Sequence, residues 1–371
     1  MFSQTKGVTN AISLALGEPD FSPPPHVSQA VKEAIDKGKT HYTPTTGIPE
    51  LLEALAKKAK RDYGLAYDPE SEILITVGGT HAISLAMEAF VNPGDEVLIP
   101  DPGFVCYGPS VSIAAGTPVP TPMLQKNGFT IDCETVISHI TGRSRMVVVN
   151  SPNNPTGSTF THGDLTAVAK IAKERDLIVI SDEVYEKITY DDARHYCMAA
   201  LPGMRERTIV IGSFSKTYAM TGFRIGYAYG PRELIASMTL AHQFSVACVD
   251  GPAQYGALAA LTGPQDCVKM MVSEFDRRRR LVFSRLNEIE GFRCGLPKGA
   301  FYLFPNIRDF GAPSEELAGY LAKNAGVVLV PGSAFGHHGE GHLRLSYATA
   351  YDKLEEAMNR IEKAARTLRK T

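Results

Sequence analysis

The sequence predicts an α/β protein with a mostly parallel sheet in a large domain and a smaller α+β domain beside it. Two observations carry this prediction. Up to about residue 290, short apolar and β-branched segments alternate with longer segments of helical periodicity. This alternation is typical of a parallel sheet with helices on both faces. After about residue 290, short strands and helices follow one another in a different pattern.

The expected strands of the large domain follow one another along the chain. They are 73–77, 96–100, 146–150, 178–181 and 208–211, and the expected helices include 48–63, 81–90, 162–175 and 233–243. Residues 224–229 predict a further strand with no crossover helix before it, so we expect it to pair antiparallel. In the smaller domain we expect strands at 300–304, 327–330 and 343–347, and a charged terminal helix at 352–371.

Composition narrows the class of protein. The chain has 371 residues, 44% of them hydrophobic, which is enough for a large core. The net charge of -2 and the pI of about 6.6 give no reason to expect a nucleic acid or an acidic membrane as partner. No uncharged apolar stretch reaches the roughly 18 residues of a membrane span, and residues 1–6 lack the apolar run of a signal peptide.

The six cysteines are scattered and form no Cys-x-x-Cys pair. This spacing argues against a zinc site and against a disulfide framework in a chain of this size. A reducing compartment suits such a sequence best. We therefore expect a soluble, cytoplasmic protein.

Polar residues follow each of the five expected strands of the large domain. They occupy positions 78–80, 101–104, 153–157, 182–185 and 213–216. The carboxyl ends of parallel strands meet at one edge of a sheet, where ligands of open α/β sheets bind. Nothing in the packing of a sheet requires polar groups at all five ends, so we expect a chemical site at this edge.

Lys216 is the most informative residue of this set. Ser213, Ser215 and Arg224 lie close to it in the sequence. An amine can form a Schiff base with an aldehyde, while hydroxyls and a guanidinium can hold a phosphate, so these residues suit a phosphorylated carbonyl cofactor. Gly79 and Thr80 open an expected helix, whose N-terminus would add backbone N–H groups to the same phosphate site. An isolated lysine is usually a solvated surface charge, but these neighbours favour the site.

Residues 212–226 resemble the lysine signature of the class I and II, or fold-type I, pyridoxal-phosphate aminotransferases. The resemblance extends over essentially the whole chain, from Leu-Gly-Glu-Pro-Asp at 16–20 to Arg-Leu-Ser-Tyr-Ala at 344–348. It implies the fold-type I architecture, with a large domain at 41–286 and a small domain formed by 1–40 and 287–371. It also implies pyridoxal 5′-phosphate as cofactor, amino acids and 2-oxo acids as substrates, and a homodimer with shared active sites.

The resemblance assigns roles around the cofactor ring. It implies that Asp182 keeps the pyridine nitrogen protonated, which lets the ring withdraw electrons from the substrate Cα. Tyr185 and Asn154 are expected to donate hydrogen bonds to the phenolic oxygen of the cofactor, and Phe104 to stack on its ring. Taken singly, these residues have simpler explanations: a helix N-cap for Asp182, a half-buried tyrosine, a turn asparagine and a core aromatic.

Further roles concern the substrate and the phosphate. The resemblance implies that Arg344 grips the substrate α-carboxylate with a planar fork, helped by Asn154 and by the backbone N–H of Gly17. An isolated arginine in a strand would more often point to solvent. Tyr42 is expected to reach the phosphate of the other subunit. Lys216 is expected to act as the base and then the acid that moves the proton of the substrate Cα.

The sequence leaves the substrate open. The loop Ala-Met-Thr-Gly-Phe-Arg at 219–224 is most similar to aspartate and aromatic aminotransferases. Some aspartate-type relatives carry a lysine after the glycine pair, where this chain has Thr80. Aromatic residues near the expected pocket (Phe21, Tyr42, Phe104 and Tyr107) support an aromatic substrate. We favour aspartate with 2-oxoglutarate; an aromatic or a broad, alanine-type specificity, a pyridoxal-phosphate lyase and a non-catalytic ligand-binding module are the alternatives.

We assign no function to three other patterns in the sequence. The Gly-Lys-Thr at 38–40 lacks the first glycine of a P-loop and follows an expected helix. The four arginines at 277–280 are expected to form a solvated or interface face of a helix. His337, His338 and His342 lack the carboxylate or cysteine partners that would complete a metal site, so we expect no metal.

Overall fold

The computed structural model describes residues 10–368, and its largest element is a seven-stranded sheet. The strand order is β2-β8-β7-β6-β5-β3-β4. Every neighbouring pair is parallel except those of β8, which runs antiparallel to both β2 and β7. The antiparallel strand expected at 224–229 is therefore confirmed. The strands are β2 (Ile73–Thr76), β3 (Glu96–Asp101), β4 (Thr117–Pro122), β5 (Ser144–Asn150), β6 (Ile178–Asp182), β7 (Thr208–Ser213) and β8 (Gly226–Tyr229).

Helices cover both faces of this sheet, as the alternating pattern predicted. Along each central strand, successive side chains enter different hydrophobic clusters; Val179 packs on one face, for example, and Ile180 on the other. One face is covered by α3 (Gly78–Phe90), α4 (Tyr107–Ile113) and α8 (Arg232–Val246). The other is covered by α2 (Pro49–Tyr63), α5 (Cys133–His139), α6 (His162–Glu174) and α9 (Gly251–Thr262).

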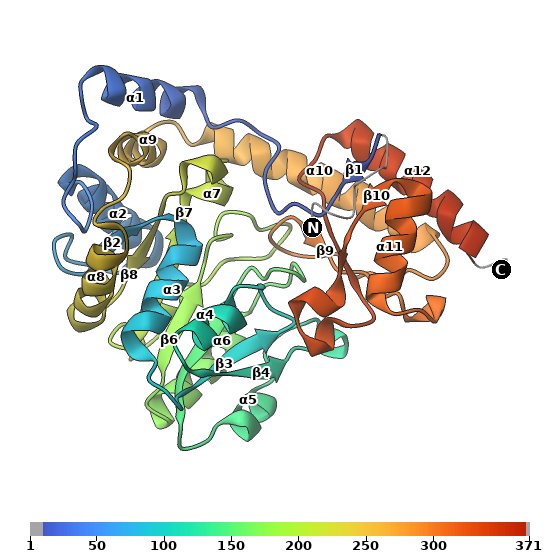
Figure 1. Ribbon diagram of the computed structural model, residues 1–371, viewed down its shortest axis with the longest axis horizontal. Helices are drawn as coiled ribbons and strands as arrows, with labels where there is room; N and C mark the ends of the chain where they lie inside the picture. Colours follow the sequence, from blue (N-terminus) through green and yellow to red (C-terminus); the bar gives the residue numbers. More distant parts are fainter. Residues whose placement is uncertain (1–9, 369–371) are drawn as a thin grey trace.

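The last part of the chain forms two small sheets at one end of the molecule (Figure 1). In one of them, β1 near the N-terminus pairs parallel with β10. The other has the antiparallel order β11-β12-β9. These elements are β1 (Ile12–Ser13), β9 (Tyr302–Leu303), β10 (Val327–Val328), β11 (Val330–Pro331), β12 (Leu343–Ser346), α11 (Ser314–Ala325) and α12 (Tyr351–Leu368).

Two further helices complete the arrangement. The long helix α10 (Asp266–Glu288) runs toward the small sheets along one side of the molecule (Figure 1). Helix α1 (Pro25–Asp36) lies at the opposite end, against α9. Among residues 10–368, the remaining helical elements are one short α-helix and six 3₁₀ turns: α7 (Phe214–Thr217), η2 (Gln125–Asn127), η3 (Met198–Ala200), η4 (Thr221–Phe223), η5 (Arg308–Phe310), η6 (Gly332–Phe335) and η7 (His337–Gly339).

The arginine run at 277–280 differs from the expectation of a solvated face. Arg278 and Arg279 are buried, at 6% and 0% exposure. Arg278 pairs with Asp20 at 2.7 Å, and Arg279 pairs with Asp191 at 2.8 Å. Buried guanidinium groups need such partners, so two of the four arginines tie α10 to neighbouring loops and the expectation is wrong for them.

No helix within the described part of the chain is long and apolar enough to cross a membrane.

Candidate active site

A cavity of about 310 Å³ lies at the carboxyl edge of the large sheet. The loops after β3, β5, β6 and β7 reach it from the large sheet, and β12 and the segment after β1 reach it from the small sheets. Its lining includes twelve residues named from the sequence: Gly17, Gly79, Thr80, Phe104, Asn154, Asp182, Tyr185, Ser213, Ser215, Lys216, Arg224 and Arg344. The structure thus brings together residues that are far apart in the chain.

Lys216 sits on α7, which starts directly after β7. Ser213 caps this short helix, since its Oγ accepts a hydrogen bond from the Ser215 N–H at 3.1 Å. The Lys216 Nζ donates to the carbonyl of Gly17 at 2.6 Å. Burial lowers the pKa of Lys216 to about 8, with Arg224 and Arg344 acting in the same direction. With this pKa, roughly a tenth of the amine is uncharged at pH 7 and about half at pH 8, and the uncharged form is the one that acts as a nucleophile or a base.

Asp182 is the last residue of β6 and is 3% exposed. The Tyr107 hydroxyl donates to its Oδ2 at 2.6 Å, and the Val184 N–H approaches its Oδ1 at 3.4 Å. The side chain of Asn150 donates to the Asp182 backbone carbonyl at 3.0 Å. Burial raises the pKa of Asp182 to about 6, against the opposing hydrogen bond from Tyr107. A cationic ring nitrogen placed beside this carboxylate would favour its ionised form.

Arg344 lies on β12 and is 5% exposed, so it does not point to solvent. Its Nη1 donates to Asn154 Oδ1 at 3.0 Å, and its Nη2 donates to the Ala15 carbonyl. Its guanidinium carbon lies 4.6 Å from the ring centroid of Tyr302 and 4.8 Å from that of Phe335. The Nε is buried and has no hydrogen-bond partner. This orphaned donor and the two forked nitrogens suit a carboxylate ligand.

Tyr185 faces the same cavity three residues after Asp182. Its hydroxyl lies 2.8 Å from that of Tyr302, and burial raises the pKa of both phenols. Both hydroxyls are therefore protonated at neutral pH, and one of the two keeps a proton to donate to an oxygen in the cavity.

The start of α3 and Arg224 form an anion cradle. Gly78 has a φ of +78°, and a Cβ at this position would lie 2.5 Å from Nη2 of Arg224. A Cβ at Gly79 would lie 3.2 Å from a methyl of Val184. These glycines let the guanidinium approach the N-terminus of α3, which is itself favourable for an anion. Ser213 and Ser215 line the same cavity.

The donor set fits pyridoxal 5′-phosphate. The cavity offers an amine with a depressed pKa for the aldehyde, a buried carboxylate for the ring nitrogen and an anion cradle for the phosphate. Arg344, with an unused buried N–H, remains free to bind a second anion.

Of the aromatic residues expected near the pocket, Phe21 and Tyr107 do not line the cavity. Among the residues with an expected cofactor or substrate role, Tyr42 is the one outside it. Its side chain is 91% exposed in this chain, so its expected contact with another subunit stays a prediction. Sequence reasoning did not assign site roles to Asn150, Tyr302 and Phe335, and it considered Tyr107 only as a pocket aromatic. The position of Asn150 at the site could have been predicted, because this residue ends the expected strand 146–150. The roles of Tyr107, Tyr302 and Phe335 depend on packing between distant elements.

The three histidines at 337–342 lie near one another but have different partners. His338 pairs through Nδ1 with Asp101 at 2.9 Å, while His342 is buried and stacks on Phe304. Among residues 10–368, no group of three or more His, Cys, Asp or Glu side chains is placed to hold a metal ion.

The fold and the residues around the cavity are those expected of a pyridoxal-phosphate-dependent transferase. The chain matches the model of the family "Aminotransferase class I and II" over residues 9–361, and it belongs to that family. The predictions of the fold-type I architecture, of aminotransferase function and of a pyridoxal-phosphate-dependent enzyme class are confirmed.

Three relatives illustrate the similarity. An aspartate aminotransferase of Pyrococcus abyssi is 46% identical over 99% of this chain and 94% of its own length. The aromatic-amino-acid aminotransferase 2 of Thermococcus litoralis is 46% identical, with 98% and 94% covered. The crystal structure of an aromatic aminotransferase from Pyrococcus horikoshii superposes with a TM-score of 0.95 at 46% identity, covering all of this chain and 99% of the other.

Proposed function

We propose that this enzyme transfers an amino group between L-aspartate and 2-oxoglutarate, with pyridoxal 5′-phosphate attached to Lys216. The observation that carries the proposal is the placement of the Lys216 amine, the Asp182 carboxylate and the Arg344 guanidinium around one cavity. One of the three relatives above is named aspartate aminotransferase and the other two aromatic aminotransferases, and two further relatives are named aspartate aminotransferase. These names support the reaction class and an acidic or aromatic donor.

Each residue has a task in this proposal. When bound, the cofactor supplies an aldehyde that accepts the amino group and a ring that withdraws electrons from the substrate Cα. Asp182 keeps a proton on the ring nitrogen, and Arg344 orients the amino acid by its α-carboxylate. Lys216 takes the proton from the substrate Cα and delivers it to C4′ of the cofactor. Gly79, Thr80, Ser213, Ser215 and Arg224 hold the phosphate.

The remaining ring contacts come from the loops after β3, β5 and β6. Phe104 stacks on the ring, while Asn154 and Tyr185 donate to its phenolic oxygen. These two contacts would stabilise negative charge on that oxygen and lower the basicity of the nitrogen that joins Lys216 to the cofactor, so that this nitrogen would remain largely unprotonated near neutral pH.

An aromatic donor is the second candidate. In the described part of the chain, the cations that line the cavity are Lys216, Arg224 and Arg344, and all three have tasks already. Thr80 occupies the position where some aspartate-type relatives carry a lysine. Leu16, Val105 and Phe335 add an apolar wall. These features favour an apolar side chain on the substrate, so the choice between the two donors requires a direct comparison.

The test is a single-turnover experiment with purified enzyme, loaded with pyridoxal 5′-phosphate and mixed with one amino acid and no acceptor. If aspartate is the donor, it converts the bound cofactor from the aldehyde to the amine form, seen as a change in absorbance, faster than phenylalanine or tyrosine does at equal concentration. Conversion by the aromatic amino acids alone would establish the second candidate. Conversion by none, with release of ammonia or thiol from another amino acid, would indicate a lyase.

We further propose a homodimer with shared active sites in the cytoplasm. The exposed apolar side chains of Tyr42, Leu240 and Phe244, at 91%, 59% and 81%, support a surface that a second copy covers. Six unpaired cysteines suit a reducing compartment. Light scattering of the purified enzyme measures the assembly.

We also propose the division into a large domain at 41–286 and a small domain at 1–40 and 287–371. Residues 1–9 and 369–371 lie outside the described part, and α1 packs on α9 of the large domain.

A further inference from the structure

The residues at the end of β6 divide between two sides. Asp182, Val184 and Tyr185 line the cavity, whereas Glu183 and Glu186 do not. Both glutamates are nevertheless buried, at 3% and 9% exposure. Two buried carboxylates therefore lie directly behind the two side chains that are proposed to contact the cofactor ring, and each needs compensation for the water it has lost.

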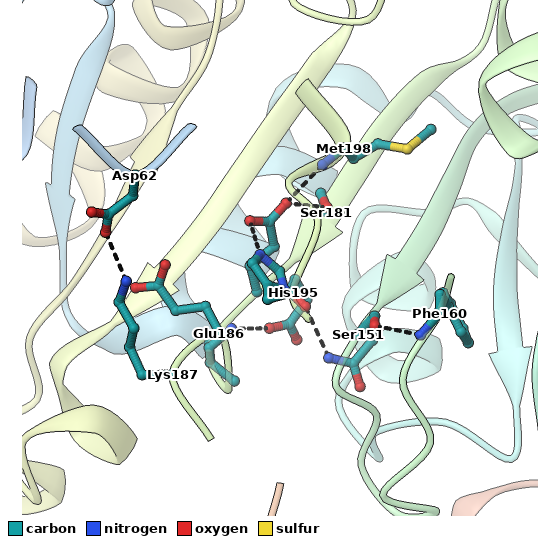
Figure 2. A network of polar contacts seen from close by, with 12 residues as sticks. Asp62, Ser151, Phe160, Ser181, Glu186, Lys187, His195 and Met198 are labelled. Atoms are coloured by element: carbon teal, nitrogen blue, oxygen red, sulfur yellow. Dashed lines mark hydrogen bonds and ion pairs between the residues drawn. The ribbon is translucent and has the colours of Figure 1, made fainter. Parts of the chain in front are cut away.

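Glu183 is compensated by three donors. Its Oε1 accepts from the Ser181 hydroxyl at 2.8 Å and from the Met198 N–H at 3.1 Å, and its Oε2 lies 2.8 Å from His195 Nε2. Figure 2 shows Ser181 of β6 and, from one later loop, His195 and Met198, all directed at this carboxylate. Burial opposes its ionisation, but His195 and the other donors hold the pKa of Glu183 below its usual value. Glu183 is therefore an anion one residue away from Asp182.

Glu186 is also held by charged partners on the same side, and we call these two buried carboxylates, Glu183 and Glu186, the anchors. The Nζ of Lys58, on α2, lies 2.7 Å from its Oε1, and Lys58 also lies 3.5 Å from Asp62. Asp62 in turn pairs with Lys187 at 2.8 Å (Figure 2). The Glu186 N–H donates to the Glu183 carbonyl, so the two anchors belong to one turn.

The backbone between the anchors offers little freedom. The N–H of Glu183 donates to the Ile211 carbonyl of β7 at 2.9 Å, which extends the sheet by one residue beyond Asp182. The direction of the Asp182 side chain is thus set by the residue that follows it. The charge of Glu183 also acts on Asp182. An uncompensated anion at Glu183 would disfavour the ionised form of the Asp182 carboxyl.

We propose that Glu183, held by His195, is a positioning residue for the reaction. It fixes the direction of the Asp182 carboxylate, and His195 compensates its charge, so that Asp182 can remain ionised against the ring nitrogen of the cofactor. This inference rests on the proposed role of Asp182. It predicts effects on cofactor binding and on kcat that loss of a merely structural hydrogen bond would not cause.

The chain offers a matched control in Glu96. This carboxylate is 4% exposed and accepts hydrogen bonds from Thr141, Arg143 and Ser144. It lies at the first residue of β3, at the edge of the sheet opposite the cavity. Glu96→Gln therefore removes a buried, hydrogen-bonded carboxylate without approaching the site.

The experiment compares Glu183→Gln, Glu96→Gln and the parent enzyme. The thermal stability of the cofactor-free proteins, the dissociation constant of pyridoxal 5′-phosphate from an absorbance titration, and kcat and KM for the best amino acid are measured. Glu183→Gln should raise the dissociation constant and lower kcat by about tenfold each, the size seen for partners that orient a ligating side chain, while KM stays near the parent value because Arg344 is untouched. Glu96→Gln should change only stability.

A second pair of variants keeps the test decisive if Glu183→Gln does not fold. His195→Gln retains an N–H donor toward Glu183, whereas His195→Leu removes it. Cofactor affinity and kcat should stay near parent values in the first and fall in the second. Equal behaviour of both His195 variants, or of Glu183→Gln and Glu96→Gln, would overturn the inference. Failure of the parent enzyme itself to bind the cofactor or transaminate would instead overturn the proposed function.

Discussion

The phenolic oxygen of Tyr107 lies 2.6 Å from Oδ2 of Asp182 and donates to it, although 75 residues separate the two in the chain. Tyr107 opens α4 on one side of the site and Asp182 ends β6 at the centre of the sheet. Burial raises the pKa of Asp182 to about 6, and this hydrogen bond opposes that rise. The ionised form of this buried carboxyl group therefore destabilises the folded protein unless a cation lies beside it.

This cost predicts the pH dependence of the cofactor-free protein. Burial raises the folded-state pKa of Asp182 to about 6 from an ordinary value of 3.8, so between these values the folded protein binds the proton more tightly than the unfolded chain does. The contribution of Asp182 to stability is present at low pH and is lost as the pH rises through about 6. Asp182→Asn should therefore raise the free energy of unfolding at pH 8, by on the order of 2 kcal/mol, while abolishing transamination. Denaturant unfolding measures it; equal or lower stability at pH 8 contradicts the prediction.

Gly78 should be required for cofactor binding rather than for folding. In Gly78→Ala the new Cβ lies within 2.5 Å of the Arg224 guanidinium, which must move out of the cradle. We expect the dissociation constant for pyridoxal 5′-phosphate to rise about tenfold, as for the loss of one charge-assisted hydrogen bond.

Gly94→Ala is the matched control for this variant. Gly94 also has a positive φ, +93°, but a Cβ there meets nothing within 4 Å. Both variants should lose about 1 kcal/mol of stability from the strained backbone, and only Gly78→Ala should lose cofactor affinity. Equal affinities would show that Arg224 does not hold the phosphate.

Arg344 should be needed as an arginine and not merely as a cation. Lysine cannot donate from two parallel nitrogens, so Arg344→Lys should raise KM for the amino acid by at least about tenfold. Cofactor affinity should stay within about threefold, because Arg344 donates to Asn154 and Ala15 and to no residue of the phosphate cradle. Steady-state kinetics test this, with the surface variant Arg293→Lys as control; an unchanged KM would refute the carboxylate assignment.

The depressed pKa of Lys216 should be visible in the rate of cofactor binding. Burial lowers this pKa to about 8, and the nearby carboxylate of Glu18 opposes the shift. The amine reacts only when uncharged, so the association rate of pyridoxal 5′-phosphate should rise with pH through about 8 and then level off. Glu18→Gln removes the opposing charge and should move the midpoint to lower pH. A midpoint near the ordinary pKa of lysine, or a shift in the opposite direction, counts against the assignment.

The architecture could be predicted where local pattern and topology agree. Strand ends at residues 150, 182 and 213 follow apolar runs, and a parallel sheet brings such ends to one edge. The sheet edge at β4 was missed because Pro118, Pro120 and Pro122 give it the composition of a loop; such a strand is tolerated only at an edge.

The interactions that tune the site were less accessible to sequence reasoning. The bond between Tyr107 and Asp182 and that between Tyr185 and Tyr302 join residues 75 and 117 positions apart. Likewise, the burial of Arg278 and Arg279 follows from the loops that pack on α10, not from its own sequence. Side-chain partners of this kind depend on tertiary packing, which cannot be inferred from the periodicity of a single sequence.

The attachment of the cofactor at Lys216 is tested most directly by chemical trapping. The enzyme loaded with pyridoxal 5′-phosphate is reduced with borohydride, which makes the bond to lysine permanent, and is then digested and mapped by mass spectrometry. We expect the modification on the peptide that contains Lys216, at about one per chain, and none after the protein has first been converted by excess amino acid substrate. Modification of another lysine, or no site-specific modification at all, would contradict the central assignment.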